Sequence, residues 1–244
     1  MNRKNTEQMH FIPGPYFQDF IPDISDAVIK KYGLAKVHYA KGQELTTPGT
    51  INNTAWFYQS GMVHVALTNS AGNSQSLVFY GPDTIFPVGV FSHENLIDYQ
   101  MEITAMTEVD AICIPYLTLR QMVLDDSELG LHLLEEDCQF IGYFFYSTMN
   151  RTWLPSRTQA ADVLWLLYTR MEHRNNGIAI SQERLASLIG LSHAQTERVL
   201  KDFRKEGILK TSRGKLFILD EGKLLSACSD DMQYYAERMK NSKA

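Results

Sequence analysis

The chain has 244 residues, enough for two compact domains, and its 44% hydrophobic and 21% charged residues exclude a disordered chain. No run approaches the roughly 20 apolar residues of a membrane span, and the start of the chain lacks the apolar core of a signal peptide, so we expect a cytoplasmic protein. Three widely spaced cysteines, Cys113, Cys138 and Cys228, indicate neither a disulfide framework nor a metal site, and we expect no cofactor.

The net charge of −5 is unevenly distributed along the chain. Residues 1–156 contain 8 Lys and Arg against 17 Asp and Glu, whereas residues 157–244 contain 15 against 11. This asymmetry favours a basic C-terminal module on an acidic body. An unevenly charged, solvated surface is the simpler alternative. No Lys or Arg lies between Lys41 and Arg120.

Strands and turns are predicted from about Leu34 to Pro115. Apolar residues alternate in Val63–Leu67, as in a half-buried strand, and glycines separate the apolar clusters at intervals of roughly ten residues. This spacing is typical of a small antiparallel barrel or jelly roll. The other clusters are Trp56–Tyr58, Leu77–Tyr80, Met101–Ile103 and Ala111–Ile114.

After Tyr116 the pattern becomes helical. A short amphipathic segment, Leu117–Leu124, is followed by Asp125-Asp126-Ser127, which can cap a longer helix. In that helix, residues spaced alternately by three and four form the seam of a two-stranded coiled coil, which predicts a homodimer; the alternative is a core helix of a monomer. The seam consists of Leu131, Leu134, Cys138, Ile141, Phe145, Thr148 and Thr152.

The segment Trp153–Arg157 contains Pro155 and is predicted to break the long helix and to act as a hinge. A further amphipathic helix is predicted from Ala160 to Met171, and Asn175-Asn176-Gly177 ends it.

Residues 181–207 carry the most informative pattern of the chain. Ser181 can cap a first helix, Gly190 provides the left-handed turn position that glycine adopts at little cost, and Ser192 can cap a second helix. Two helices joined in this way form a helix-turn-helix, whose second helix enters the major groove of DNA. Residues 210–219 then read as a two-stranded wing that turns at Arg213-Gly214.

This segment resembles the winged helix-turn-helix of the Crp/Fnr superfamily, and Lys41-Gly42, Ser60-Gly61 and Gly81-Pro82-Asp83 fall where that family's sensory barrel has its turns. The halogenated-phenol-responsive branch looks closest. The resemblance implies an α+β fold with a cyclic-nucleotide-binding-like β jelly-roll barrel, a dimerisation helix and a winged helix-turn-helix. The expected domains are residues 1–128, 129–156 and 157–244.

The resemblance also assigns DNA contacts. Base readers at the start of the second helix would be His193, Ala194 and Arg198, of which Arg198 can bind guanine O6 and N7 through two hydrogen bonds. The cyclic-AMP receptor has Arg-Glu where this chain has His193-Ala194, so we expect a palindromic operator richer in A·T pairs. Expected contacts to the DNA backbone are Ser181, Gln182, Ser192, Gln195 and Lys201.

The resemblance places ligand binding in residues 86–101, where the family's cyclic-nucleotide binders have an arginine for the phosphate. This chain has no arginine there, and a buried unpaired phosphate is costly, so we expect no cyclic nucleotide. We expect a small apolar or aromatic effector between the barrel and the dimer helix, unless these side chains simply fill the barrel. The candidate lining is Phe86, Val88, Phe91, Tyr99, Tyr143 and Phe144.

Together these features predict a homodimeric DNA-binding regulator that contacts RNA polymerase. One alternative is a regulator without a small-molecule effector, controlled by a partner protein or by cysteine oxidation. An enzyme with a cupin-like barrel is the other alternative, but His38, His64 and His93 are not arranged in the metal-binding motif that it needs, and we expect no catalytic residues.

Overall fold

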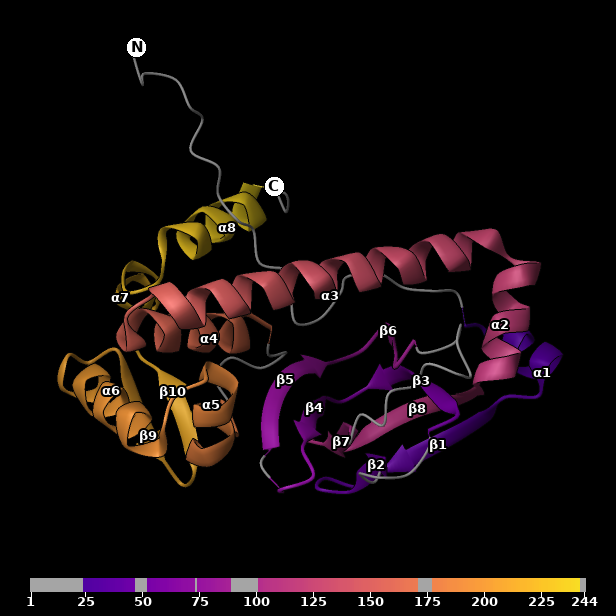
Figure 1. Cartoon of the computed structure of the whole chain (residues 1–244), viewed down its shortest axis with the longest axis horizontal. Helices are drawn as coiled ribbons and strands as arrows, with labels where there is room; N and C mark the ends of the chain where they lie inside the picture. The colour runs from indigo at the N-terminus through magenta and orange to yellow at the C-terminus, as the bar shows by residue number, and fades with distance from the viewer. Residues whose placement is uncertain (1–23, 47–51, 73, 89–100, 171–176, 242–244) are drawn as a thin grey trace, which may run out of the picture. The chain divides into compact units, whose positions relative to one another are not determined.

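The computed structural model describes residues 24–46, 52–72, 74–88, 101–170 and 177–241 (Figure 1). The chain divides into two compact units between Cys138 and Gln139, a point that lies within the long helix α3 (Ser127–Trp153). The two units are described separately below.

The first unit is an antiparallel barrel of two four-stranded sheets. In each sheet, strands that are distant in sequence are neighbours, as in a double-sheet jelly roll. One sheet has the order β1 (Ala35–Tyr39), β8 (Val109–Pro115), β3 (Thr54–Ser60), β6 (Thr84–Phe86). The other has the order β2 (Glu44–Thr46), β7 (Met101–Ala105), β4 (Val63–Thr68), β5 (Ser74–Tyr80).

Among its described residues, this unit also contains the helices α1 (Asp26–Tyr32) and α2 (Tyr116–Asp125) and the first half of α3. Ser25 caps α1, and Asp126 accepts a hydrogen bond from the backbone of Glu128 at the start of α3. The core joins strands and helices because apolar residues of β3, β8, α2 and α3 form one buried cluster. Its members include Phe57, Ile112, Ile114, Leu119, Met122, Leu129 and Leu133.

The second unit begins with the C-terminal half of α3 and the helix α4 (Ser156–Arg170). The helix-turn-helix consists of α5 (Gln182–Ile189) and α6 (His193–Lys205), and the wing of β9 (Leu209–Ser212) and β10 (Lys215–Ile218). Two further helices follow, α7 (Glu221–Ser226) and α8 (Asp230–Asn241).

The predicted fold class is confirmed: an N-terminal barrel, a long helix and a C-terminal winged helix-turn-helix. The helix predicted from Ala160 begins earlier, at Ser156, because Pro155 lies before its first turn, where a missing N–H costs nothing. The sequence pattern did not predict α7 and α8. The predicted domain boundaries stay predictions, although the structure divides into units within α3.

Gly61 lies in the tight turn between β3 and β4 with φ of +81°, and a Cβ there would overlap the carbonyl oxygen of Glu108 and lie 2.9 Å from Val109 Cα. We expect Gly61→Ala to destabilise the barrel by about 3 kcal/mol or more, because strain and overlap add. Gly42→Ala is the matched control: φ is +87° but the Cβ would meet nothing within 4 Å, so strain alone costs about 1 kcal/mol.

Amide hydrogen exchange of β4 in the parent and in the two variants measures the free energy of local opening of the barrel, and the difference from the parent gives each destabilisation. Equal effects of the two substitutions would contradict the close approach of Gly61 to β8.

Candidate DNA interface and effector region

The recognition helix α6 begins with a capping box. The Ser192 hydroxyl oxygen accepts a hydrogen bond from the Gln195 backbone N–H at 3.2 Å, and Gln195 Oε1 accepts one from the Ser192 N–H at 3.0 Å. The Ser192 hydroxyl also lies 2.8 Å from Gln195 Oε1 and donates to it. These bonds fix the first turn of α6, so its leading side chains are presented by a rigid backbone.

One face of α6 packs into its own unit, and the opposite face is exposed. Val199, Leu200 and Phe203 are buried, as the sequence predicted. The three predicted base readers, His193, Ala194 and Arg198, are all exposed, and so are Gln195 and Lys201. The structure therefore brings the predicted base readers together on the free face of the helix's N-terminal half.

The predicted backbone contacts have different environments. The Ser181 hydroxyl accepts a hydrogen bond from the Arg184 N–H at 3.1 Å and caps α5, so its own proton stays available to a phosphate. Gln182 is half-buried. Gly190 adopts φ of +83° at the end of α5, as its turn position requires.

Sequence reasoning missed a bridge between the recognition helix and the wing. The Arg204 guanidinium donates to Glu197 Oε1 at 2.6 Å and to Thr211 Oγ1 at 3.2 Å. The spacing of Glu197 and Arg204, two helical turns apart, was the available signal. Because Arg204 is paired with a carboxylate, it contributes less to phosphate attraction than its charge suggests.

A second arginine, Arg157, pairs with a carboxylate at the C-terminal end of α6. Arg157 forms two hydrogen bonds with the carboxylate of Glu206, at 2.8 and 2.7 Å, and lies over the ring of Phe203. These hydrogen bonds lower the pKa of Glu206.

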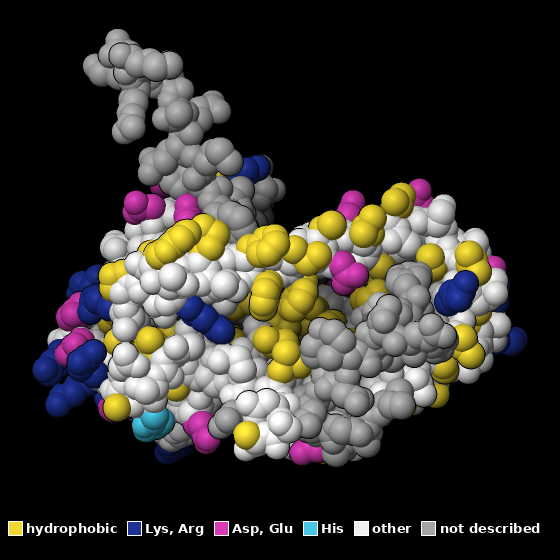
Figure 2. All heavy atoms as spheres, in the orientation of Figure 1, with side chains coloured by type: hydrophobic (Ala, Val, Ile, Leu, Met, Phe, Trp, Pro, Cys, Tyr) yellow, Lys and Arg dark blue, Asp and Glu magenta, His cyan; other side chains and the backbone are white. Residues whose placement is uncertain are grey.

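Other Lys and Arg side chains are exposed on the surface over α6 and the wing (Figure 2). The wing turn places Arg213 and Gly214 at positive φ, 49° and 73°, between the basic residues Lys210 and Lys215. This turn geometry matches the predicted position of the wing tip.

The predicted coiled-coil seam is exposed at every position along α3, and apolar side chains follow this helix in Figure 2. The opposite face of α3 is buried through Leu129, Leu133, Glu136, Tyr143 and Tyr146. Further apolar side chains are exposed toward the end of α3, including Trp153 at 70%. One face of α3 is thus buried within the chain, whereas the opposite face remains exposed in the single chain.

The predicted effector lining is only partly described. Phe86 is half-buried and stacks on Tyr80 with ring centroids 4.1 Å apart, and Val88 packs against the barrel core. Phe91 and Tyr99 lie outside the described residues. In the second unit Tyr143 is buried, whereas Phe144 is 50% exposed.

Glu136 is a buried acid that sequence reasoning missed in the first unit. It is 5% exposed on the inner face of α3. Burial raises the pKa of Glu136 to about 8, against a hydrogen bond with the backbone of Ile85 that lowers it, and Asp137 adds to the rise. Its spacing of three from Leu133 and seven from Leu129 and Tyr143 was the signal, because these residues share one helical face.

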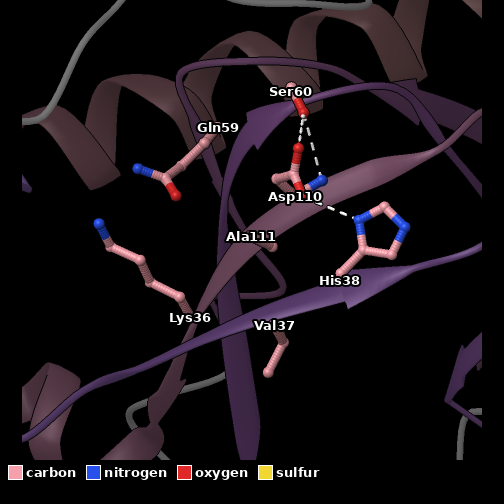
Figure 3. A pocket seen from close by; sticks show the side chains of 7 residues that line it. All are labelled: Lys36, Val37, His38, Gln59, Ser60, Asp110 and Ala111. Atoms are coloured by element: carbon pink, nitrogen blue, oxygen red, sulfur yellow. Dashed lines mark hydrogen bonds and ion pairs between the residues drawn. The ribbon is translucent and has the colours of Figure 1, made fainter.

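A shallow pocket of about 430 Å³ lies over β1, β3 and β8 in the first unit. Figure 3 shows Asp110 between Ser60 and His38: Asp110 accepts a hydrogen bond from Ser60 at 2.8 Å, and its other oxygen lies 2.8 Å from His38 Nδ1. The hydrogen bond with Asp110 raises the pKa of His38, although partial desolvation opposes it, and Glu108 adds a second contact to the ring at 3.1 Å. The serine pairs with the aspartate and not with the imidazole, so this group lacks the nucleophile–base contact of a hydrolase.

Within the part of the chain that the structure describes, no three His, Cys, Asp or Glu side chains are grouped as a metal site. Cys138 is exposed on the α3 seam, Cys113 is half-buried and Cys228 is buried. No helix among the described residues is both long and apolar enough to cross a membrane.

Two protein-family models match the chain. The Crp-like helix-turn-helix domain matches residues 160–227, which include the whole helix-turn-helix and wing. The cyclic nucleotide-binding domain matches residues 36–126, which include the barrel strands. The chain belongs to the Crp/Fnr family of DNA-binding transcription regulators. No protein of curated function matches the sequence.

Solved Crp/Fnr-type structures share this fold at low identity. A Crp/Fnr-family transcriptional regulator from Thermus thermophilus is 20% identical, with a TM-score of 0.66 over 79% of this chain and 97% of that one. A mutant of CooA from Carboxydothermus hydrogenoformans is 19% identical, with a TM-score of 0.64 over 84% of this chain and 91% of that one. A cysteine-to-serine mutant of CprK in a complex with OCPA is 17% identical, with a TM-score of 0.59 over 81% of this chain and 91% of that one.

Glu136→Gln should change how stability depends on pH. The folded-state pKa of Glu136, about 8, lies above its ordinary value of 4.5, so the protonated acid is favoured by folding and this contribution is lost as pH rises toward 8. In that window the parent should lose up to about 1.4 kcal/mol of unfolding free energy per pH unit relative to the glutamine variant. Urea denaturation at pH 5 and pH 8 measures the difference.

The matched control is Glu135→Gln, at the neighbouring exposed position, which should leave the pH profile close to that of the parent. A Glu136→Gln profile parallel to that of the parent would contradict the burial of this acid.

Proposed function

We propose that the protein is a homodimeric, sequence-specific transcription regulator whose DNA binding is controlled by a small apolar or aromatic effector other than a cyclic nucleotide. The observation that carries the DNA-binding part is the capping-box start of α6, with His193, Ala194 and Arg198 exposed together on its free face. A regulator of this kind acts in the cytoplasm, contacts RNA polymerase and is not an enzyme. The domain limits 1–128, 129–156 and 157–244 belong to the same proposal.

Arg198 reads a guanine through two hydrogen bonds, and Ala194 contacts a thymine methyl group. His193 lies beside them at the start of the helix. Ser181, Gln182, Ser192, Gln195 and Lys201 approach the phosphates. The Ser192 hydroxyl is already engaged by Gln195, so the phosphate near this position is bound mainly by the backbone N–H groups of the first turn. The operator is a palindrome that is richer in A·T pairs than the operator of the cyclic-AMP receptor.

The exposed seam of α3 forms the dimer with a second copy of the chain. Leu131, Leu134, Cys138, Ile141, Phe145, Thr148 and Thr152 repeat at coiled-coil spacing and are exposed in the single chain. A helix that exposes this many large apolar side chains is stable in water only when they are covered.

The predicted effector site combines side chains of the barrel segment 86–101 with side chains of α3. Residues 42–119, which include most of the barrel strands, contain no Lys or Arg, and Glu136 is a buried acid, so this segment offers a cyclic nucleotide's phosphate no counter-charge. Its candidate lining is the one predicted from the sequence: Phe86, Val88, Phe91, Tyr99, Tyr143 and Phe144. Kinship with the halogenated-phenol-responsive branch stays a prediction.

A second candidate is a regulator without a small-molecule effector, controlled by a partner protein or by oxidation of cysteine. The exposure of Cys138 on the seam favours it, because a two-fold axis along α3 would place two copies of this thiol close together.

Arg198→Ala should remove sequence preference. The protein's own upstream DNA and a shuffled duplex, compared by fluorescence anisotropy at one stated salt concentration, should differ in affinity for the parent but not for the variant. We expect a loss of about 1–3 kcal/mol in specific binding for each lost guanine contact.

Lys205→Ala is the control, because this exposed residue lies in the last turn of the same helix, away from the base-reading end. It should weaken binding to both duplexes alike. Undiminished sequence preference in the Arg198→Ala protein would contradict the assignment of the recognition helix.

The double variant Ile141→Asp/Phe145→Asp should be monomeric in analytical ultracentrifugation. Two carboxylates on the seam would have to be buried without partners, which costs several kcal/mol, so the dimer dissociation constant should rise by about 100-fold or more. Leu124→Asp is the control, since Leu124 is also apolar and exposed but lies on α2, outside the seam. A dimer that survives the double substitution would place the interface elsewhere.

A further inference from the structure

A buried carboxyl group joins three helices of the second unit. Asp162, on α4, is 2% exposed. Its Oδ2 atom accepts hydrogen bonds from the Tyr146 hydroxyl of α3 at 2.6 Å and from the Ser229 hydroxyl at 2.8 Å, and its Oδ1 atom accepts one from the Ser229 N–H at 2.8 Å. Ser229 immediately precedes α8, and its hydroxyl oxygen also accepts from the Met232 N–H.

The carboxyl group of Asp162 is surrounded by hydrogen-bond donors. Both carboxylate oxygens face hydrogen-bond donors, and the Asn150 side chain of α3 adds a longer contact to Oδ2 at 3.4 Å. Tyr146 and Ser229 are themselves buried, so the cluster has little access to water. Burial raises the pKa of Asp162, and the hydrogen bonds from Tyr146 and Ser229 oppose this rise. Separation of α3 from α4 would leave a buried carboxyl group without its partners, which is strongly unfavourable.

Two more contacts brace the same junction. The Gln159 side chain of α4 donates to the carbonyl oxygens of Leu154, at 2.7 Å, and Arg151, at 3.4 Å, and so closes the end of α3. The Arg151 guanidinium donates to the Leu188 carbonyl of α5 at 3.3 Å. Its side chain lies against Gly190, where a Cβ would come within 2.9 Å of Arg151 Cδ.

The junction between α3 and α4 is only Leu154-Pro155, which the sequence predicted to be a hinge. Contacts on both sides of Leu154-Pro155, called the elbow below, indicate that this junction is rigid. Asp162 ties α4 back to α3 two turns before the elbow, and Arg151 ties α3 to the turn of the helix-turn-helix beyond it. Rotation at residues 153–157 would break these contacts together.

We propose that Asp162 is a positioning residue for DNA recognition: it fastens the DNA-binding domain to the C-terminal half of α3 and so sets the half-site spacing that the dimer accepts. This inference rests on the proposed function as a dimeric DNA-binding regulator. The C-terminal half of α3 and the winged helix-turn-helix then move as one body, and an effector-dependent rearrangement takes place N-terminal to Tyr146 rather than at the elbow. The helix α8, through Ser229, is part of the fastening.

The test compares the full-length parent with Tyr146→Phe, which removes one hydrogen bond to Asp162 and keeps the aromatic ring, and with Asp162→Asn, which replaces an acceptor oxygen by a donor. The matched control is Tyr168→Phe. Tyr168 on α4 also donates to a carboxylate, Glu221 of α7, but this bond lies inside the DNA-binding domain and does not cross the elbow.

Each protein is titrated with duplexes that carry the selected palindrome at its own half-site spacing, the same half-sites moved apart by two base pairs, or a single half-site. The parent and Tyr168→Phe should bind the altered spacing about 100-fold more weakly, because a rigid dimer cannot engage both half-sites. Tyr146→Phe and Asp162→Asn should bind the two spacings within about 5-fold of each other, with unchanged affinity for the single half-site.

Tyr146→Phe and Asp162→Asn should also speed amide exchange in the peptide 150–160, which Tyr168→Phe should not. A purely structural role would lower affinity for all duplexes alike and leave the spacing preference intact, and that result would overturn the proposal. Fast exchange of this peptide in the parent would overturn it as well. Failure of the proposed function is distinguishable, because the parent itself would then show no sequence preference.

Discussion

The α3 helix has apolar side chains on two opposite faces, and the rest of the structure depends on how each face is covered. Within the chain, Leu129, Leu133, Tyr143 and Tyr146 are buried on one face of the helix. The other face, with Ile141 and Phe145, is exposed in the single chain. An isolated helix with two apolar faces is unstable in water. The folding of the chain and its proposed association with a second copy therefore depend on the same 27-residue helix.

The cations of the DNA-binding unit divide into two groups. Arg151, Arg157 and Arg204 each make directed hydrogen bonds to a carbonyl or carboxylate within the unit and brace the recognition helix. Arg198 and Lys201 are exposed on α6. Arginine suits the bracing role because its planar guanidinium presents several donors in a fixed geometry. The positive charge of the C-terminal part therefore serves both to hold the reading surface in place and to attract DNA.

Among the described residues, the buried acids are Glu136, on α3 in the first unit, and Asp162, on α4 in the second, and their chemical surroundings differ. Asp162 meets donors at both oxygens, which suits a fixed structural junction. Glu136 lies beside the backbone of Ile85, and its pKa of about 8 places its titration near physiological pH.

Most local features of this chain could be predicted from sequence, because short-range geometry determines them. The caps Ser181 and Ser192, the left-handed turn at Gly190, the wing turn at Arg213-Gly214 and the coiled-coil periodicity all involve residues within one or two helical turns of each other. The exposed position of the base readers followed from the same periodicity, and their roles on DNA remain predictions.

The tertiary structure alone decided which distant residues meet. Tyr146 and Ser229 lie 16 and 67 residues from Asp162 in the sequence, and no periodicity links them. The same holds for Arg151 and the turn at Gly190. The segment 153–157 was predicted to be a hinge because it contains a proline, but in the folded chain side-chain contacts hold it in place. A proline indicates only where a helix breaks. Whether the break can move depends on side chains brought to it from elsewhere in the chain, and their approach is a property of the packed fold.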